Sequence, residues 1–180
     1  TTDAVAAYLI HSGRDDGKFL NTVGVFMQPL MVIGRVNPTH PFREQVAQVH
    51  REIQALFDHQ AYPVELVLDS LGIAAQAIPF AFNVLDLPNH LQQAALSEFG
   101  SYWKDDAPIA KFPLELYVVE HQNGLEFFWS FDSQHFDFPT IDFIGKEYVT
   151  LLGQLLETGS LPLGARRTLA LPAVGEGTDA

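Results

Sequence analysis

The sequence predicts a single layered domain of mixed α/β or α+β class, with helices packed on a β-sheet. Its 180 residues are about the length of one domain. Hydrophobic residues make up 47 % of the chain, which is enough to form a core. Short apolar runs bounded by glycine and proline, typical of strands, mingle with segments whose apolar residues recur at helical spacing. No internal repeat is visible.

Residues 4–11 and 23–36 are predicted to be the first two strands. The first run ends at a charged, glycine-containing turn at residues 12–17, and the second run is rich in β-branched residues. Pro29 cannot donate a ladder hydrogen bond, so we expect a sheet edge, a bulge or a break there. His11 precedes an Asp-Gly pair, which suggests a general-base histidine held by an aspartate. The charges and glycines favour the other interpretation, a strand end with a solvated turn.

The clearest helix follows, with Thr39 as the N-cap candidate and Pro41 near the first turn. It should end near His59, because Pro63 disfavours helical geometry at the residue before it. Apolar side chains at helical spacing should face the core: Phe42, Val46, Val49, Ile53, Leu56 and Phe57. Polar side chains should form the opposite face: Arg43, Glu44, Gln48, Arg51, Glu52 and Gln54.

A second, shorter helix is expected from Pro63 to a stop at Gly72. Its inward residues should be Val64, Val67, Leu68 and Leu71. Residues 78–87 follow as a strand with one very apolar face. That face should carry Ile78, Phe80, Phe82 and Val84. Residues 88–111 lack a clear period, which indicates a long loop or crossover.

Residues 112–120 and 125–131 are predicted to form a hairpin, because Asn123-Gly124 lies between two apolar runs. A last helix should open at Phe138-Pro139 and stop near Gly159. Its inward residues should be Ile141, Ile144, Tyr148, Leu151, Leu152 and Leu155. Residues 164–180 are predicted to be a linker or flexible tail, so the domain is expected to span residues 1–163.

Composition argues against several classes of function. The 10 basic and 22 acidic residues give a formal charge of −12, so we expect no nucleic-acid partner, which would need clustered cations. The absence of cysteine excludes disulfides, zinc–thiolate sites and cysteine nucleophiles within these residues, and it fits a cytoplasmic protein. No apolar run reaches membrane-spanning length, and no signal peptide is expected at the N-terminus.

Catalytic and ligand-binding motifs are not evident. The sequence contains neither a phosphate-binding glycine loop nor the GxSxG motif of hydrolases. Its seven histidines show no metal-ligand spacing, so no metal site is expected. Trp103 and Trp129 suit either ligand stacking or burial in a core or interface, and the second interpretation is favoured.

Four segments in register carry a resemblance to a known family. They are "GRDDGKFLNTVGVFMQPLMVIGRV", "PFREQVAQVHREIQALFDHQAYPVELVLDSLG", "IPFAFNVLDL" and "AKFPLELYVVEHQNGLEFFWSFDSQHFDFPTIDFIGKEYVTLLGQLL". Over residues 3–163 the chain resembles the C-terminal lobe of the condensation domains of nonribosomal peptide synthetases. The residues that match the family's structural motifs are Gly13, Arg14, Gly24, His59, Gln60 and Pro63.

The resemblance implies half of a chloramphenicol-acetyltransferase-like sandwich, with helices packed on a mixed β-sheet. In this family two lobes form a V, and carrier proteins deliver thioester-bound groups to a tunnel between them. The implied partners are therefore adenylation and carrier-protein domains of a synthetase. No cofactor of the chain itself is implied, although the phosphopantetheine of a partner carrier protein would approach it.

The family's HHxxxDG motif, which belongs to the N-terminal lobe, is not found in this chain. We therefore expect that the chain does not perform the family's general-base chemistry by itself. Departures from the family pattern also affect polar positions of the C-terminal lobe. They are Gln28-Pro29 in the strand motif, Ala61 and Val64 in the His-Gln motif, and residues 74–77, where an arginine is usual.

The leading hypothesis is a non-catalytic, truncated lobe that acts as a structural or docking platform for an adenylation domain, a carrier protein or another partner. The alternative is the acceptor-side fragment of an amide-forming domain whose N-terminal lobe comes from elsewhere. A third is an unrelated small-molecule-binding domain. An apolar surface at Phe99, Tyr102 and Trp103 would suit a domain contact or a homodimer. His59 is expected to be structural, at the end of its helix.

Overall fold

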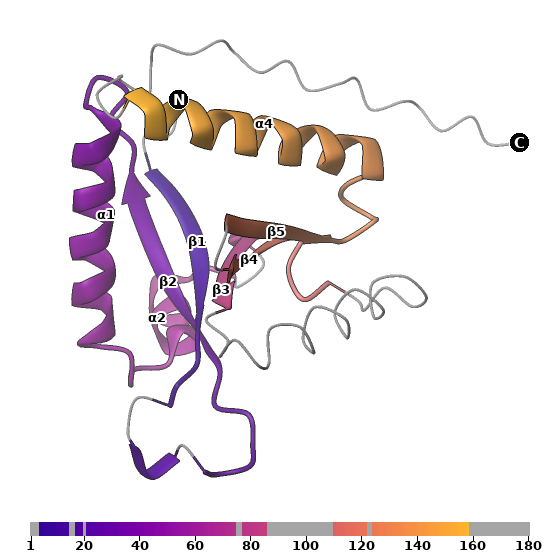
Figure 1. The fold of residues 1–180 in the computed structure, drawn as a ribbon. Helices are drawn as coiled ribbons and strands as arrows, with labels where there is room; N and C mark the ends of the chain where they lie inside the picture. The colour runs from indigo at the N-terminus through magenta and orange to yellow at the C-terminus, as the bar shows by residue number, and fades with distance from the viewer. Residues whose placement is uncertain are drawn as a thin grey trace, which may run out of the picture.

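The computed structural model describes residues 4–14, 17–19, 21–74, 77–85, 110–121 and 124–158. These residues form one five-stranded mixed sheet with the strand order β2-β1-β3-β4-β5, accompanied by helices (Figure 1). The strands are β1 (Ala4–His11), β2 (Gln28–Arg35), β3 (Phe80–Leu85), β4 (Leu114–His121) and β5 (Gly124–Phe131). The predicted layered α/β class is confirmed.

Pairing within the sheet joins local and distant segments. β1 and β2 are antiparallel, with His11 opposite Gln28, whereas β1 and β3 are parallel, with Tyr8 opposite Ala81. β3 is also parallel to β4. β4 and β5 are antiparallel and close on the pair His121 and Gly124. This pairing confirms the predicted hairpin, whose two turn residues lie outside the described part of the chain.

Helices α1 (Phe42–Phe57), α2 (Val64–Leu71) and α4 (Phe138–Thr158) follow one another in the predicted order. The described residues also include a short 3-10 turn, η1 (Gly17–Phe19), which was not predicted. α2 stops at Gly72, whose φ of 66° lies in the left-handed region that glycine adopts at low cost. The prediction of Thr39 as N-cap of α1 is wrong. Pro41 occupies that position without a side-chain cap bond, and the Thr39 hydroxyl donates to Asn37 Oδ1 instead.

α2 and α4 cover opposite faces of the sheet. Tyr8 and Ala81 share one face and pack with α2 in a core cluster of Tyr8, Val64, Leu68, Ile78 and Ala81. On the other face, the rings of Phe127 and Trp129 meet Tyr148 of α4 edge-on at 5.5 and 5.6 Å. α4 extends along the sheet near β5 (Figure 1). Ile141 and Leu155 are buried, and Ile144, Tyr148, Leu151 and Leu152 are half-buried, so the predicted inward face of α4 is confirmed.

Several predicted core positions are wrong. Val46 is 49 % exposed because α1 turns Gln45, one residue earlier, inward. Leu71 is exposed because it is the last residue of α2. Val84 is exposed near the end of β3. Ile78 is buried as predicted, but it precedes β3 and packs on the α2 side with Ala81.

Polar side chains on α1 also depart from the predicted pattern. Gln45 is buried, where its amide donates to the carbonyls of Asn37 and His40 and its Oε1 accepts from the Asn37 N–H. Gln48 and Glu52 were expected to be exposed but are half-buried, and Gln48 Nε2 donates to Glu52 Oε1. The inward surface of α1 is therefore partly polar.

The second predicted strand is shorter than expected. Residues 23–27 form a loop, and only Gln28–Arg35 pairs with β1. Pro29 lies in β2, which is an edge strand of the sheet, so the predicted edge position is confirmed. A missing N–H is tolerated there because one side of an edge strand has no ladder partner.

Candidate docking surface at the end of β1

The carboxyl end of β1 leads into a long excursion, residues 12–27, before the chain returns as β2. β3 and β4 are parallel to β1 through the ladder, so the three strands end at the same edge of the sheet. In open α/β sheets, ligands bind outside the carboxyl ends of the strands. Figure 1 shows the excursion projecting away from the sheet and helices.

Arg14 organises this excursion from within. Its guanidinium donates to three backbone carbonyls, those of Phe19 at 2.5 Å, Thr22 at 2.8 Å and Gly24 at 2.8 Å. It also lies over the ring of Phe26, 4.4 Å from the centroid. A planar guanidinium offers several donors in fixed directions and an extended face. One side chain therefore holds the outgoing arm of the loop, at Phe19, and the returning arm, at residues 22–26.

Two glycines make this arrangement sterically feasible. Gly13 has a φ of 66°, and a Cβ at that residue would lie 2.2 Å from the Phe26 carbonyl oxygen. Gly24 has a φ of 152°, a backbone conformation that residues with a side chain rarely adopt. The structure therefore brings together Gly13, Arg14 and Gly24, three of the residues that match the family's structural motifs. The sequence did not predict that these residues contact Phe19 and Phe26. The ring centroids of Phe19 and Phe26 lie 5.2 Å apart.

The loop that Arg14 braces carries apolar side chains into solvent. Val23 is 100 % exposed, Val25 is 87 % exposed and Met27 is 56 % exposed. Single exposed apolar residues are ordinary, but here three alternate residues of one braced loop are all exposed. We call Val23, Val25 and Met27 the loop patch.

The remaining motif residues, His59, Gln60 and Pro63, lie in the turn between α1 and α2, which contacts the end of the Arg14 loop. Gln28, which directly follows the loop patch, donates from Nε2 to the Gln60 carbonyl at 3.1 Å. Its ladder partner His11 meets the ring of Phe57 at the end of α1, with centroids 5.0 Å apart. The turn at residues 58–63 is thereby held against the ends of β1 and β2, and Tyr62 within it is 59 % exposed.

His59 lies in this turn with an exposed side chain, and Asp58 beside it is exposed too. Its backbone N–H donates to the Leu56 carbonyl, and its carbonyl accepts from the Tyr62 N–H. Pro63 precedes α2 as its N-terminal boundary residue. These backbone contacts define the turn, and a role of the imidazole at the helix end stays a prediction.

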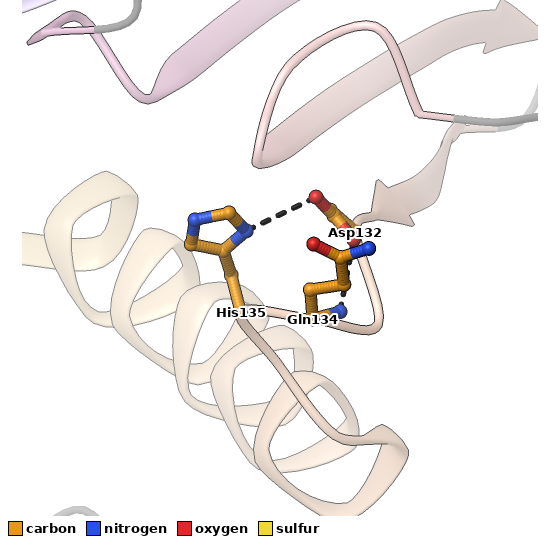
Figure 2. A network of polar contacts seen from close by, with 3 residues as sticks. All are labelled: Asp132, Gln134 and His135. Carbon is orange, nitrogen blue, oxygen red and sulfur yellow. Dashed lines mark hydrogen bonds and ion pairs between the residues drawn. The ribbon is translucent and has the colours of Figure 1, made fainter.

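Asp132 and His135 form a polar contact in the connection between β5 and α4. His135 Nδ1 lies 3.0 Å from Asp132 Oδ2, while Asp132 Oδ1 accepts from the Gln134 N–H at 2.9 Å (Figure 2). The His135 side chain is exposed, and that of Asp132 is half-buried. These hydrogen bonds, led by that from Gln134, lower the pKa of Asp132. The arrangement is a turn that leads into α4, where Asp137 Oδ1 accepts from the Thr140 N–H.

Glu115 and Tyr117 form a second polar contact, on the face of the sheet opposite α4. Glu115 is 5 % exposed, and the Tyr117 hydroxyl donates to its Oε1 at 3.2 Å. Burial, together with the charge and hydrogen bond of Glu115, raises the pKa of Tyr117 to about 12. Both residues come from β4, so the pair belongs to the interior of the fold.

Within the described part of the chain, no cluster of three or more His, Asp or Glu side chains is arranged to hold a metal ion. Its helices, moreover, do not combine the length and apolarity that crossing a bilayer requires. The predicted interface residues Phe99, Tyr102 and Trp103 lie outside the described residues, as does the predicted tail at residues 164–180. Trp129, by contrast, is half-buried against α4.

The fold of the chain matches that of solved condensation domains. The chain superposes on the first condensation domain of the CDA synthetase with a TM-score of 0.72 and 14 % identity, covering 94 % of this chain and 38 % of that one. A four-domain nonribosomal peptide synthetase, AB3403, gives a TM-score of 0.74 at 10 % identity, with 91 % of this chain and 14 % of that chain covered. At these identities the likeness shows the fold alone.

Sequence comparison gives the family. The Condensation domain model matches residues 1–170, and the chain therefore belongs to the condensation-domain family. A plipastatin synthase polypeptide of Bacillus subtilis (strain 168) is 28 % identical over 145 residues, which are 78 % of this chain. Tyrocidine synthase 2 of Brevibacillus parabrevis is 27 % identical over 156 residues, or 83 % of this chain. The chain spans 4 % of the length of each of these relatives.

Proposed function

We propose that this chain is a docking lobe of a nonribosomal peptide synthetase, which binds a neighbouring domain and does not catalyse amide formation by itself. The observation that carries the proposal is the loop patch, an apolar surface that Arg14 holds out from the carboxyl edge of the sheet. A preordered loop loses little conformational entropy on binding, so its apolar area contributes more to affinity. A cytoplasmic location is part of the same proposal.

The proposed partners are an adenylation domain or a carrier protein, the latter carrying phosphopantetheine. The relatives support this choice because they are synthetases much longer than this chain. The chain's formal charge of −12 disfavours a strongly acidic partner surface, so affinity should come from the loop patch rather than from charge attraction.

The test measures binding of the purified chain to its cognate adenylation domain and carrier protein, each presented separately, by calorimetry. Val25→Asn should weaken binding about tenfold or more, as removal of a central apolar contact does. Leu156→Asn is the matched control, because Leu156 is also an exposed apolar residue, at 71 %, but lies on α4. Absence of binding to both domains, or equal loss in both variants, contradicts the proposal.

A second candidate function is the acceptor-side portion of an active condensation domain that is completed by an N-terminal lobe. The observation in its favour is that the chain matches 38 % of the length of a solved condensation domain. In this case the loop patch would be covered by that lobe. Mixing the chain with a cognate N-terminal lobe and two loaded carrier proteins should then give amide formation, in which an amine nitrogen attacks the thioester carbonyl carbon and the carrier thiol leaves. Binding of the lobe without product supports the docking role instead.

A further inference from the structure

The chain contains sulfur at two positions only, and their surroundings differ. It has two methionines, Met27 and Met31, and no cysteine. Met27 is the last residue of the loop patch and is 56 % exposed. Met31, four residues later in β2, is half-buried and packs against the core cluster that contains Tyr8. Because exposure governs the oxidation of sulfur side chains, an oxidant in solution should react with Met27 in preference to Met31.

The fold holds the backbone on both sides of Met27 in place. The ring of Phe26, which precedes it, lies 4.4 Å from the Arg14 guanidinium. Gln28, which follows it, pairs with His11 in the ladder and donates to the Gln60 carbonyl at 3.1 Å. Both neighbours of Met27 are therefore fixed by contacts within the fold, whereas the Met27 side chain itself is open to solvent.

We propose that Met27 is a site of reversible oxidation by hydrogen peroxide, and that this modification weakens docking at the loop patch. An S–O bond forms at the Met27 thioether as the O–O bond of the peroxide breaks, so the sulfur is oxidised to the sulfoxide and the peroxide is reduced to water. Sulfoxide reductases, with a dithiol as the reductant, reverse the change. The effect on docking rests on the function proposed above, whereas the selectivity for Met27 over Met31 does not.

Oxidation of Met27 should affect binding and leave the stability of the free chain unchanged. In the free chain, water can hydrogen-bond to the sulfoxide oxygen because the side chain is largely exposed. Docking would remove that water and bury the oxygen at an apolar surface beside Val25, which costs free energy. Oxidation of Met31 would act differently, because it would place a polar group against the core cluster and destabilise the fold.

The first test measures selectivity on the chain alone. The purified chain is treated with hydrogen peroxide at neutral pH, and mass spectrometry follows the gain of oxygen at each methionine. Both methionines lie in one tryptic peptide, residues 19–35, so fragment ions must place the added oxygen. In the folded chain Met27 should react about tenfold or more faster than Met31, because burial protects the second thioether. In denaturing urea the two rates should become equal.

The second test measures binding before and after oxidation, by calorimetry with the adenylation domain and the carrier protein in turn. The peroxide is removed before mixing, so that the partner is not oxidised. Oxidation should raise the dissociation constant about tenfold or more, and the reductases should restore it. Met27→Leu removes the reactive sulfur, so peroxide should leave the affinity of this variant unchanged, whatever that affinity is. Met31→Leu is the matched control, and its binding should stay sensitive to peroxide.

Equal oxidation of Met27 and Met31 in the folded chain overturns the proposal, as does sensitivity to peroxide that persists in Met27→Leu. An affinity that is unchanged when Met27 is oxidised overturns the effect on docking. A lower melting temperature of the chain oxidised at Met27 contradicts it too, because weaker binding would then follow from damage to the fold. If the untreated chain binds neither domain, the docking role and its control by oxidation both fail, whereas the oxidation rates still decide the selectivity for Met27.

Discussion

The guanidinium of Arg14 lies 4.4 Å above the ring of Phe26 and at the same time binds the Gly24 carbonyl two residues earlier. Both contacts fall on the returning arm of the loop, whereas its bond to the Phe19 carbonyl falls on the outgoing arm. The Gly13-Arg14 motif at the end of β1 therefore stabilises the conformation of the loop. Arg14 forms no ion pair with any carboxylate in the described part of the chain.

Arg14→Lys is expected to destabilise the loop, because an ammonium cannot reach three carbonyls and stack on a ring in one geometry. We expect a loss of about 1–2 kcal/mol in the free energy of unfolding, since the hydrogen bonds are partly exposed. Amide hydrogen exchange at residues 21–27 should also accelerate. Urea denaturation and exchange measured by NMR check this. Arg43→Lys, on the exposed face of α1, is the control, and equal effects would contradict the role given to Arg14.

Gly13→Ala should destabilise the fold by about 1–3 kcal/mol, because its backbone is left-handed and the added carbon would overlap the Phe26 carbonyl. Gly17→Ala is the matched control in the same loop. A Cβ at Gly17 would meet no atom within 4 Å. Thermal unfolding of the two variants measures the difference, and similar melting temperatures would show that the loop relaxes freely.

Stability should fall in alkaline solution through Tyr117. Its pKa in the folded chain is raised to about 12, above the value of 10.0 for an unperturbed tyrosine, so the folded state retains its proton longer than the unfolded state. The contribution is fully present below pH 10.0 and is lost as the pH rises towards 12. Tyr117→Phe should make the free energy of unfolding less dependent on pH over this range, as measured by urea titrations. An unchanged slope would show that other groups dominate, among them Tyr8 and Tyr148, whose pKa values are also raised.

Asp137 should make the start of α4 sensitive to acid. Hydrogen bonds from Thr140 lower the pKa of the Asp137 carboxyl below its ordinary value of 3.8. The contribution to stability is thus present above pH 3.8 and is lost as the pH falls through the lower pKa of the folded state. Asp137→Asn should keep the capping acceptor but abolish this acid step, whereas Asp137→Ala should lose the cap at every pH. Helix content and unfolding midpoints at acidic and neutral pH distinguish the two variants.

Much of the fold could be predicted from local patterns. The hairpin followed from Asn-Gly between apolar runs, and the stop of α2 followed from Gly72, because both depend on neighbouring residues alone. The inward side of α1 was predicted for most of its apolar residues, since Phe42, Val49, Ile53, Leu56 and Phe57 are half-buried, but the burial of Gln45 in place of Val46 could not be predicted. Buried Gln45 binds the backbone of residues 37–40, and this contact turns Val46 outward.

The candidate site was only partly visible in the sequence. The family resemblance singled out Gly13, Arg14 and Gly24, and the structure brings them together with Phe26. The exposure of Val23 was not predicted, because its β-branched neighbours suggested a strand. Loop geometry overrides local β preference here, since the bonds of Arg14 hold the backbone away from the ladder.

The parallel pairing of Tyr8 with Ala81 has a kinetic consequence. The β4–β5 hairpin closes over two residues, whereas β1 and β3 meet only after the intervening loop, β2, α1 and α2 have been gathered. Bringing such distant segments together lowers the conformational entropy of the chain before stabilising contacts between them form. The hairpin should therefore form early during refolding, and the joining of β1 to β3 should be the slow event that completes the centre of the sheet.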